Sequence, residues 1–482
     1  MLKILNLLPR IPTPMVDGGA IAVYYNLLNI KRQGVDVVVA AFESNRHPQD
    51  VAMMQAEFQL YSVPGNFQEY SGMSAFKNLF DARPYNLALR FDQDRFRDLL
   101  RKVRNDHPHF DVVQCDWVYM APYVPLVREL WPDAKMVLRQ HNAEYMIFGR
   151  MAEHETSLKN RLFLKLQTAK MKRYEAKALG WFDHVITLTD VDRQLFEQLE
   201  QGMVSVISRH SVLPSESGDT SHSTSKFAND GETDSPGNDQ TTESHLTNAE
   251  TLKFKPKEGS TRGKVNLGTP SDASGNFSRY STLPVGVDLS RFARPEGLPR
   301  KKQFLILGSM GWSPYVQALL WFLHQVWIDI HNVLPDYKLV IVGSGAPEEI
   351  TKFSGHYNIE ITGFVPDVMP YLHESAAMIV PLKSGSGMRI KIIEAMAAEL
   401  PIITTSVGCE GIPILHQQDC LIGNRVEELQ QAIIDFTRLE DQGNRLSSNA
   451  LRIAAENFSW ESISRNTVEL YLNIIDNDNR LI

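Results

Sequence analysis

The stretch PLKSGSGMRIKIIEAMAAELPIITTSVGCEGI, residues 381–412, decides the fold of this 482-residue chain. An apolar run over residues 376–382 leads into a short glycine loop. A helix is then predicted from about residue 388 to 399, because apolar residues recur there at the spacing of one buried face. The residues of that face are Ile392, Ala395, Met396 and Leu400. A proline and the apolar pair 402–403 indicate a parallel strand, so the stretch predicts a strand-loop-helix-strand unit.

The glycine loop faces the N-terminus of that helix, where free backbone N–H groups and the helix dipole favour an anion. Arg389 and Lys391 add two cations at the same end, where they oppose the helix dipole unless an anion binds between them. Further along the helix, the Glu394 carboxylate can accept hydrogen bonds from two vicinal hydroxyls, such as those of a ribose. The pattern therefore indicates a diphosphate and ribose site. The alternative is a glycine turn before an ordinary helix with a solvated charged face.

The motif GSGMRIKIIEAMAAELPIITTSVGCEGI resembles the C-terminal signature of the family 4 retaining glycosyltransferases, also called glycosyl transferases group 1. The resemblance implies an α/β chain with the GT-B fold, in which two Rossmann-like domains face each other across a cleft. It also implies that the loop and the two cations hold the donor diphosphate and that Glu394 binds the nucleotide ribose. The family often has a second glutamate where this chain has Ser386, so the selection of the donor sugar stays open.

The composition describes a long, acidic, cysteine-poor chain. Its length fits two large domains with full cores, and its net charge of −8 argues against nucleic acid as a main partner. The cysteines Cys115, Cys409 and Cys420 lack paired metal-ligand spacing, and no run of about 18 apolar residues indicates a membrane span. The N-terminal MLKILNLLPRIP is too short an apolar run for a signal peptide. We therefore expect a cytoplasmic protein without structural zinc.

A second glycine loop lies near the N-terminus. Residues 2–8 predict a buried strand, residues 20–32 a helix and residues 35–42 the next strand, with the pair Gly18-Gly19 just before the helix. The loop lacks the G-x-G-x-x-G fingerprint of a dinucleotide site. The family carries a similar loop here, which implies contact with the donor phosphate or the acceptor across the cleft. The alternative is a turn glycine beside a helix cap.

Polar residues follow a predicted strand in RQHNAEY, residues 139–145. Runs at residues 110–115 and 135–138 predict two parallel strands, and α/β proteins bind ligands at the carboxyl ends of such strands. The HN-x-E pattern resembles the family's, in which the matching histidine lies beside the donor sugar. Two interpretations of His141 stay open: it positions sugar hydroxyls or assists the acceptor, or it is a structural histidine. We do not expect it to bind a metal.

A basic helix is predicted over residues 159–177. Its cations are Lys159, Arg161, Lys165, Lys170, Lys172, Arg173 and Lys177, against the single acid Glu175. Its apolar stripe consists of Leu158, Leu162, Leu166 and Ala169. Two interpretations stay open: a solvated charged face on a helix that packs on the core, or peripheral attachment to an anionic membrane surface.

Five regions are predicted: an N-terminal Rossmann-like acceptor domain (1–208), a disordered insertion (209–280), an interdomain linker (281–300), a C-terminal nucleotide-sugar domain (301–458) and a C-terminal helix that crosses back onto the N-terminal domain (459–482). The insertion is inferred from residues 215–278, which are rich in Ser, Thr, Asn, Asp and Gly and poor in large apolar residues. In the C-terminal domain, ITGFV at 361–365 resembles the family's segment that contacts the nucleotide base, which implies that Val365 lies at the donor site.

The resemblance implies a metal-independent glycosyltransferase of hexosyltransferase type that needs no cofactor. It would move a sugar from a nucleotide-diphosphate sugar to a saccharide or lipid-linked acceptor with retention, in cell-surface polysaccharide or glycolipid synthesis. The predicted catalytic residues are His141, Arg389 and Lys391. The predicted donor-binding residues are Glu394, Gly385, Ser386, Gly387, Met388, Val365, Gly18 and Gly19. The alternatives are a GT-B nucleotide-sugar epimerase and a non-catalytic relative that binds nucleotide sugar in an assembly complex.

Overall fold

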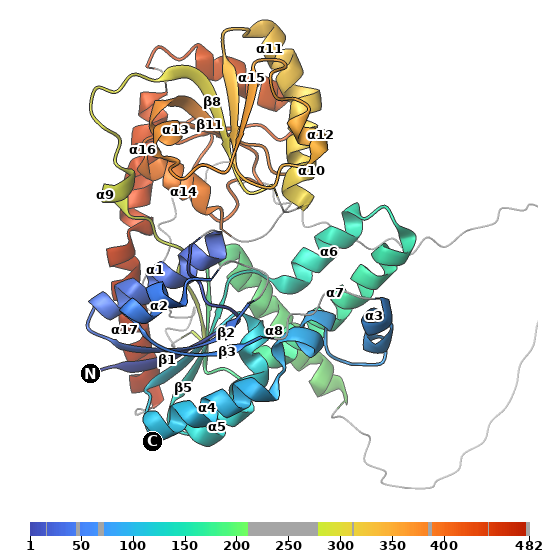
Figure 1. The fold of residues 1–482 in the computed structure, drawn as a ribbon, viewed down its shortest axis with the longest axis vertical. Coiled ribbons are helices and arrows are strands. Elements are labelled where there is room, and N and C mark those ends of the chain that lie inside the picture. The colour runs from blue at the N-terminus through green and yellow to red at the C-terminus, as the bar shows by residue number, and fades with distance from the viewer. Residues whose placement is uncertain are drawn as a thin grey trace, which may run out of the picture.

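The computed structural model describes residues 1–15, 17–44, 49–65, 72–210, 278–310, 313–383, 388–441 and 443–478. Two α/β domains are stacked along the long axis of the molecule, each built on one sheet (Figure 1). The strand pairings in both sheets are parallel. The predicted fold class, α/β with two Rossmann-like domains, is therefore confirmed. Most of the predicted insertion lies outside the described residues.

The N-terminal domain is a parallel sheet with helices on both faces. Its strands are β1 (Lys3–Leu8), β2 (Asp36–Glu43), β3 (Gln59–Pro64), β4 (Val112–Asp116), β5 (Lys135–Gln140), β6 (His184–Thr187) and β7 (Tyr280–Thr282). Its helices are α1 (Gly18–Arg32), α2 (Val51–Glu57), α3 (Gly72–Asn78), η1 (Leu87–Phe91), α4 (Asp94–Asp106), η2 (Val118–Tyr123), α5 (Val124–Leu130), α6 (Glu144–His154), α7 (Leu158–Leu179) and α8 (Asp190–His210). The strand order is β3-β2-β1-β4-β5-β6-β7.

The C-terminal domain repeats this plan with a smaller sheet. Its strands are β8 (Lys301–Leu307), β9 (Lys338–Val342), β10 (Ile359–Gly363), β11 (Ser375–Val380), β12 (Ile402–Thr404) and β13 (Leu421–Ile422), in the order β10-β9-β8-β11-β12-β13. The remaining helices are α9 (Leu289–Phe292), α10 (Ser313–Phe322), η3 (Leu323–Trp327), α11 (Ile328–Val333), α12 (Glu348–Thr351), α13 (Met369–Glu374), α14 (Ile390–Ala397), α15 (Val426–Thr437), α16 (Asn444–Phe458) and α17 (Trp460–Asp478). No helix in the described part of the chain is both long and apolar enough to cross a bilayer.

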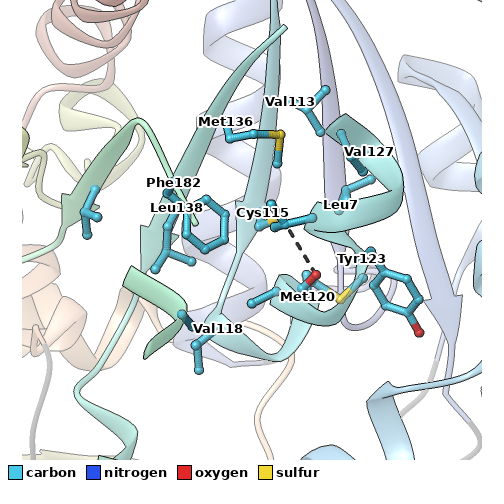
Figure 2. Packing of buried hydrophobic residues seen from close by; sticks show 14 of the residues in the cluster. Leu7, Val113, Cys115, Val118, Met120, Tyr123, Val127, Met136, Leu138 and Phe182 are labelled. Atoms are coloured by element: carbon cyan, nitrogen blue, oxygen red, sulfur yellow. Dashed lines mark hydrogen bonds between the residues drawn. The ribbon is translucent and has the colours of Figure 1, made fainter. Parts of the chain in front are cut away.

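Successive residues of the N-terminal strands point to opposite faces of the sheet, and both faces are covered. Leu5 and Val113 pack with α4, α5, α7 and α8 in one buried cluster, whereas Ile4 and Val112 pack with α1 and α17 in another. Figure 2 shows the first cluster around Cys115, whose thiol points toward the backbone of η2. Burial on both faces explains why these strands read as near-continuous apolar runs.

The chain returns to the N-terminal sheet before it enters the second domain. β7 pairs with β6 at the edge of that sheet, with Tyr280 opposite Val185. The predicted linker, residues 281–300, therefore begins inside a strand of the N-terminal domain. A strand of three residues, Tyr-Ser-Thr, carries no periodic signal beside a long Ser- and Thr-rich segment, so sequence patterning does not reveal it.

Two segments connect the domains side by side. Residues 283–288 lead from β7 to α9, and residues 458–460 lead from α16 into α17. Val287 N donates to Phe458 O at 2.7 Å, and Val287 forms a parallel bridge with Ser459. A Cβ built on Gly286 would lie 2.4 Å from Trp460 Cδ2, so a residue without a side chain is needed for the two segments to approach this closely.

Helix α17 packs the C-terminal end of the chain against the N-terminal domain. Leu470, Tyr471 and Ile474 share a buried cluster with Val23 and Leu27 of α1. Figure 1 shows the helix running from the junction along the side of the N-terminal sheet. The two domains are thus linked by a paired crossing and by the apolar face of one long helix.

The close packing at the crossing predicts the effect of adding a single methyl group at Gly286. Replacing Gly286 by Ala places a Cβ 2.4 Å from an atom of the Trp460 ring, and relieving that overlap moves one of the two segments. Overpacking of this kind costs about 1–3 kcal/mol, so Gly286→Ala is expected to lower the midpoint of urea or thermal unfolding.

The matched control for this prediction is Gly72→Ala in α3. Nothing lies within 4 Å of a Cβ added there, so the stability of this variant should stay within about 0.5 kcal/mol of the parent. Equal unfolding midpoints for the two variants would contradict the close approach at the crossing.

Candidate functional site

The candidate site lies where the strand order reverses in each sheet. β1 lies between β2 and β4, and β8 lies between β9 and β11. Open parallel sheets bind ligands beyond the carboxyl ends of their strands at such a switch point. α1 follows β1 and α14 follows β11, so each presents its N-terminus there. Figure 1 shows the two helices on facing sides of the domain junction.

Helix α14 carries the predicted diphosphate residues. It begins at Ile390, later than predicted, because Arg389 has a non-helical backbone (φ −89°, ψ 82°) and acts as the N-cap. Lys391 lies in the first turn, and Glu394, one turn further on, stays partly exposed. The predicted apolar face is confirmed, because its members are fully buried: Ile392, Ala395, Met396 and Leu400.

Burial destabilises the charges of these three polar side chains. It lowers the pKa of Lys391 to about 8 and that of Arg389 to about 10. It raises the pKa of Glu394 to about 7, although the Lys391 charge opposes this shift. Two cations thus meet the positive end of a helix dipole in a partly desolvated place, which is unfavourable without an anion. The arrangement suits a bound anion together with hydroxyl donors at Glu394.

The glycines at the start of α1 lie against this site. A Cβ added to Gly18 would lie 3.1 Å from Ile390 Cδ1, so the first residue of α1 lies close to the first residue of α14 across the junction. A Cβ added to Gly19 would lie 3.2 Å from Trp117 Cζ2. Asp17 caps α1 by accepting a backbone hydrogen bond with its side chain. The structure therefore brings two helix N-termini from different domains to one place.

His141 follows β5 on the N-terminal side of the junction. Its ring stacks on Trp117, with 3.7 Å between the ring centroids and 15° between the ring planes. Its Nε2 donates to Asp116 Oδ1 at 2.9 Å. Burial lowers the pKa of His141 to about 4, although the hydrogen bond to Asp116 opposes this shift. The imidazole is therefore neutral at pH 7, with its proton on Nε2 and Nδ1 left as an acceptor.

Asp116 orients His141 as part of a buried chain of hydrogen bonds. It also accepts from Asn6 at 2.7 Å and from Gln114 at 3.1 Å, and Gln114 accepts from Tyr471 of α17 at 2.5 Å. Burial raises the pKa of Asp116, but the hydrogen bond from His141 and neighbouring positive charge outweigh it and hold the pKa below its ordinary value. Asp116 is thus an ionised acceptor that fixes the imidazole tautomer.

The backbone of Trp117 is strained. Its φ of 64° and ψ of 144° fall in a region that residues with side chains rarely adopt. Its backbone N donates to Arg139 O at 3.0 Å, which ties the strained residue to the neighbouring strand β5. This conformation places the indole between Gly19 and His141.

Buried acids hold the HN-x-E segment in place. Glu175 of α7 accepts from the backbone N of Glu144 and of Tyr145, each at 3.0 Å. Tyr119 donates to Glu144 at 2.9 Å. Burial, opposed by this hydrogen bond, raises the pKa of Glu144 to about 7, and burial together with the Glu144 charge raises that of Glu175. Glu175 therefore anchors the start of α6, just after His141.

Sequence reasoning missed several charged and aromatic residues of the junction. Asp116 and Trp117 directly follow the strand predicted at residues 110–115, and their place at the carboxyl end of a central strand was a usable signal. Arg150 of α6, Asp192 of α8 and Glu410 all act on the charge of Arg389. These three carried no local signal, because their approach depends on how the helices and the domains pack.

The other predicted site residues are placed in part. Val365 and Met388 pack against the buried cluster that contains the apolar face of α14. Gly385, Ser386 and Gly387 lie outside the described residues. Across the described part of the chain, no three His, Cys, Asp or Glu side chains gather as a metal-binding group.

Comparison with known proteins supports the fold. Residues 301–438 match the family model described as Glycosyl transferases group 1. The sucrose-phosphate synthase of Thermosynechococcus elongatus aligns with a TM-score of 0.60 at 13% identity, over 98% of this chain and 100% of that one. HepE of Anabaena, solved with UDP and glucose, aligns with a TM-score of 0.57 at 13% identity, over 97% of this chain and 99% of that one. The fold is GT-B.

Curated relatives match a shorter part of the chain. TuaC of Bacillus subtilis, named as a teichuronic acid biosynthesis glycosyltransferase, is 29% identical over 173 residues, which cover 32% of this chain and 41% of TuaC. The matches to curated relatives span 41 to 45% of those proteins' own length. The sequence matches thus support a group 1 glycosyltransferase, and the full-length likeness is one of fold.

The Asp116–His141 pair predicts a specific protonation state. In ¹⁵N-histidine-labelled protein, the His141 resonances, assigned with a His141→Gln variant, should show the neutral Nε2–H tautomer at pH 7. Because burial lowers the pKa to about 4, they should show no charging between pH 8 and 5.5. Asp116→Asn should move the ring proton to Nδ1, since an amide can donate to Nε2. A doubly protonated ring at pH 6 would contradict the assignment.

Proposed function

We propose that this protein is a retaining glycosyltransferase that moves a hexosyl group from a nucleotide-diphosphate sugar to a saccharide or lipid-linked acceptor. One observation carries the proposal: the N-termini of α1 and α14 lie close together at the junction, where Gly18 is next to Ile390 beside the cations Arg389 and Lys391. Backbone N–H groups, helix dipoles and fixed cations at one place suit a diphosphate, whose negative charge grows as the glycosidic bond breaks.

Each part of the donor has a partner in this proposal. Arg389 and Lys391 hold the diphosphate, Glu394 accepts from the ribose hydroxyls, and the backbone near Val365 lies at the base. His141 accepts a hydrogen bond from a sugar hydroxyl at Nδ1. The bond between the anomeric carbon and the diphosphate oxygen breaks with its electrons going to the diphosphate. The acceptor oxygen then bonds to the same face of the sugar, and its proton passes to the departing diphosphate oxygen. Fixed cations supply the charge that stabilises the leaving group, so the proposed reaction uses no metal ion.

Similar proteins guide the choice of donor and acceptor. HepE was solved with UDP and glucose, and TuaC is named for teichuronic acid biosynthesis. We therefore propose a UDP-hexose as the first donor to test and a cell-surface polysaccharide or glycolipid as the product, made on the cytoplasmic face of the membrane.

Two other functions share the same donor site, and one assay separates all three. The protein is incubated with a panel of UDP-, GDP- and ADP-hexoses, with and without acceptors. Transfer, or slow donor hydrolysis with the α or β configuration of the donor retained, supports the proposal. Interconversion of two donor sugars without transfer identifies an epimerase. Donor binding without any turnover identifies a non-catalytic binding protein.

Mutations should distinguish the residue that binds the ribose of the donor from the residues that bind its diphosphate. Glu394→Ala removes a charge-assisted acceptor, which costs about 1.5–3 kcal/mol, so donor affinity should fall roughly tenfold to a hundredfold. Arg389→Ala and Lys391→Ala should depress the single-turnover rate more than the donor affinity, because the diphosphate charge is largest in the transition state. Calorimetry and single-turnover kinetics measure both effects. Parent-like values for all three variants would overturn the assignment.

Donor affinity should also depend on pH in a bell shape. Glu394 accepts hydroxyl hydrogen bonds best when ionised, so affinity should rise as pH increases through about 7. Lys391 holds the diphosphate only when protonated, so affinity should fall as pH increases through about 8. Calorimetry with UDP-glucose from pH 5.5 to 9.5 tests this, because the donor's own diphosphate does not titrate in that range.

Two conservative variants show which residue causes each side of the bell-shaped pH dependence. Glu394→Gln should flatten the acidic limb, and Lys391→Arg, which keeps its charge, should flatten the alkaline limb. A bell that persists unchanged in both variants would show that other groups control the pH dependence.

A further inference from the structure

Large apolar side chains stay exposed on two neighbouring helices of the N-terminal domain. On α3 and just after it, Phe76 is 58% exposed and Phe80 is 82% exposed. On α7, Leu158 is 67% exposed and Leu162 is 59% exposed. Met73, Leu79 and Leu166 are exposed beside them. Large exposed apolar patches on soluble proteins mark interaction surfaces.

Direct hydrogen bonds join the two helices. Lys170 of α7 donates to the backbone oxygens of Asn78 and Asp81, at the end of α3. Gln167 of α7 donates to Asn78 Oδ1 at 2.9 Å and accepts from Tyr85 N at 2.8 Å. Figure 1 shows α3 and the α6–α7 pair projecting together from one side of the N-terminal domain. We call the exposed apolar residues on or just after α3 and on α7, together with the neighbouring cations of α7, the docking face. Its residues are Met73, Phe76, Leu79, Phe80, Leu158, Leu162, Leu166, Lys159, Lys165 and Arg173.

Helix α7 has two different stripes, and the core uses the one that sequence patterning did not select. The stripe predicted from the sequence is exposed, and it consists of Leu158, Leu162, Leu166 and Ala169. The core instead receives a second stripe at helical spacing, which consists of Gln167, Met171, Glu175 and Ala178. Packing against the core therefore leaves the more apolar stripe of the helix without a partner.

The docking face is positively charged on an acidic protein. α7 carries seven Lys and Arg residues against one acid, the buried Glu175, while the chain has a net charge of −8. Lys159, Lys165 and Arg173 are exposed, and no ion pair within the described part of the chain engages them. Cations beside protruding Leu and Phe side chains are the pattern of helices that bind at an anionic bilayer surface.

Charge decides between two occupants. A second copy of the chain docked through the same face would set the α7 cations of one copy against those of the other, because a two-fold interface uses the same patch twice. An anionic bilayer meets the cations with opposite charge and accepts the apolar side chains. We propose that the docking face binds the surface of a membrane that contains anionic lipids. This proposal rests on α3 and α7 and does not depend on the proposed function.

Vesicle binding of the full-length protein tests the proposal. With phosphatidylcholine vesicles that contain 30 mol% phosphatidylserine, we expect co-sedimentation in 0.1 M salt, weakened in 0.5 M salt because exposed charges are screened. With phosphatidylcholine alone we expect at least tenfold less binding. A folded protein that ignores the phosphatidylserine vesicles would overturn the proposal.

Two variants separate the apolar and charged parts of the docking face. Phe76→Ser with Phe80→Ser removes apolar side chains, and Lys159→Glu with Lys165→Glu and Arg173→Glu reverses charge. Each should reduce vesicle binding at least tenfold, with the thermal melting midpoint unchanged. Because all these residues are exposed or at the surface, the variants should fold.

Matched controls lie elsewhere on the surface. Val333→Ser removes an exposed apolar residue of α11, and Lys102→Glu with Lys302→Glu and Lys352→Glu makes the same change of net charge. Parent-like vesicle binding of both controls supports a specific face, whereas an equal loss in the controls overturns it. Sedimentation velocity tests for the other occupant, a second copy of the chain. A dimer that dissociates in the Phe76→Ser/Phe80→Ser variant would show that a second copy covers the face.

Discussion

The candidate site depends on the paired crossing of the chain between the two domains. Gly286 lets residues 283–288 lie against Trp460, and the bridge from Val287 to Ser459 fixes their register. The predicted donor residues of α14 and the glycines of α1 belong to different domains, so their distance is set by this crossing and by α17. The same helix is connected to the candidate site, because Tyr471 begins the hydrogen-bond chain that ends at His141.

Desolvation is the common cause of the unusual protonation states around the junction. It brings the pKa of Lys391 and of Glu394 close to neutrality and keeps His141 uncharged. Each of these groups prefers a ligand that restores what burial removed: an anion for the lysine, hydroxyl donors for the glutamate and for the free ring nitrogen. A donor bound as proposed would therefore relieve an electrostatic cost that is already present in the folded protein.

The sequence was sufficient for those parts of the fold that local patterns encode. The buried face of α14 and the parallel strands around it follow from apolar spacing, and the α/β class follows with them. Spacing misled at α7, because the stripe that meets the core includes the polar residues Gln167 and Glu175, and apolar spacing alone selects the other stripe. Apolar spacing gave no signal for β7, whose three residues form a strand because they pair with β6 at the edge of the sheet. Arg150 and Glu410 approach Arg389 only through tertiary packing, which no short motif records.

Helix α7 also joins the docking face to the candidate site. Its exposed end carries Leu158 and Leu162. Near its other end, Glu175 accepts a hydrogen bond from the backbone of Glu144, just after His141. A single packed helix is stiff over the length between these two ends. A bilayer bound along the docking face would therefore be held in one orientation relative to the site. Only acceptors whose reactive hydroxyl can reach the site from that bilayer surface would then be used.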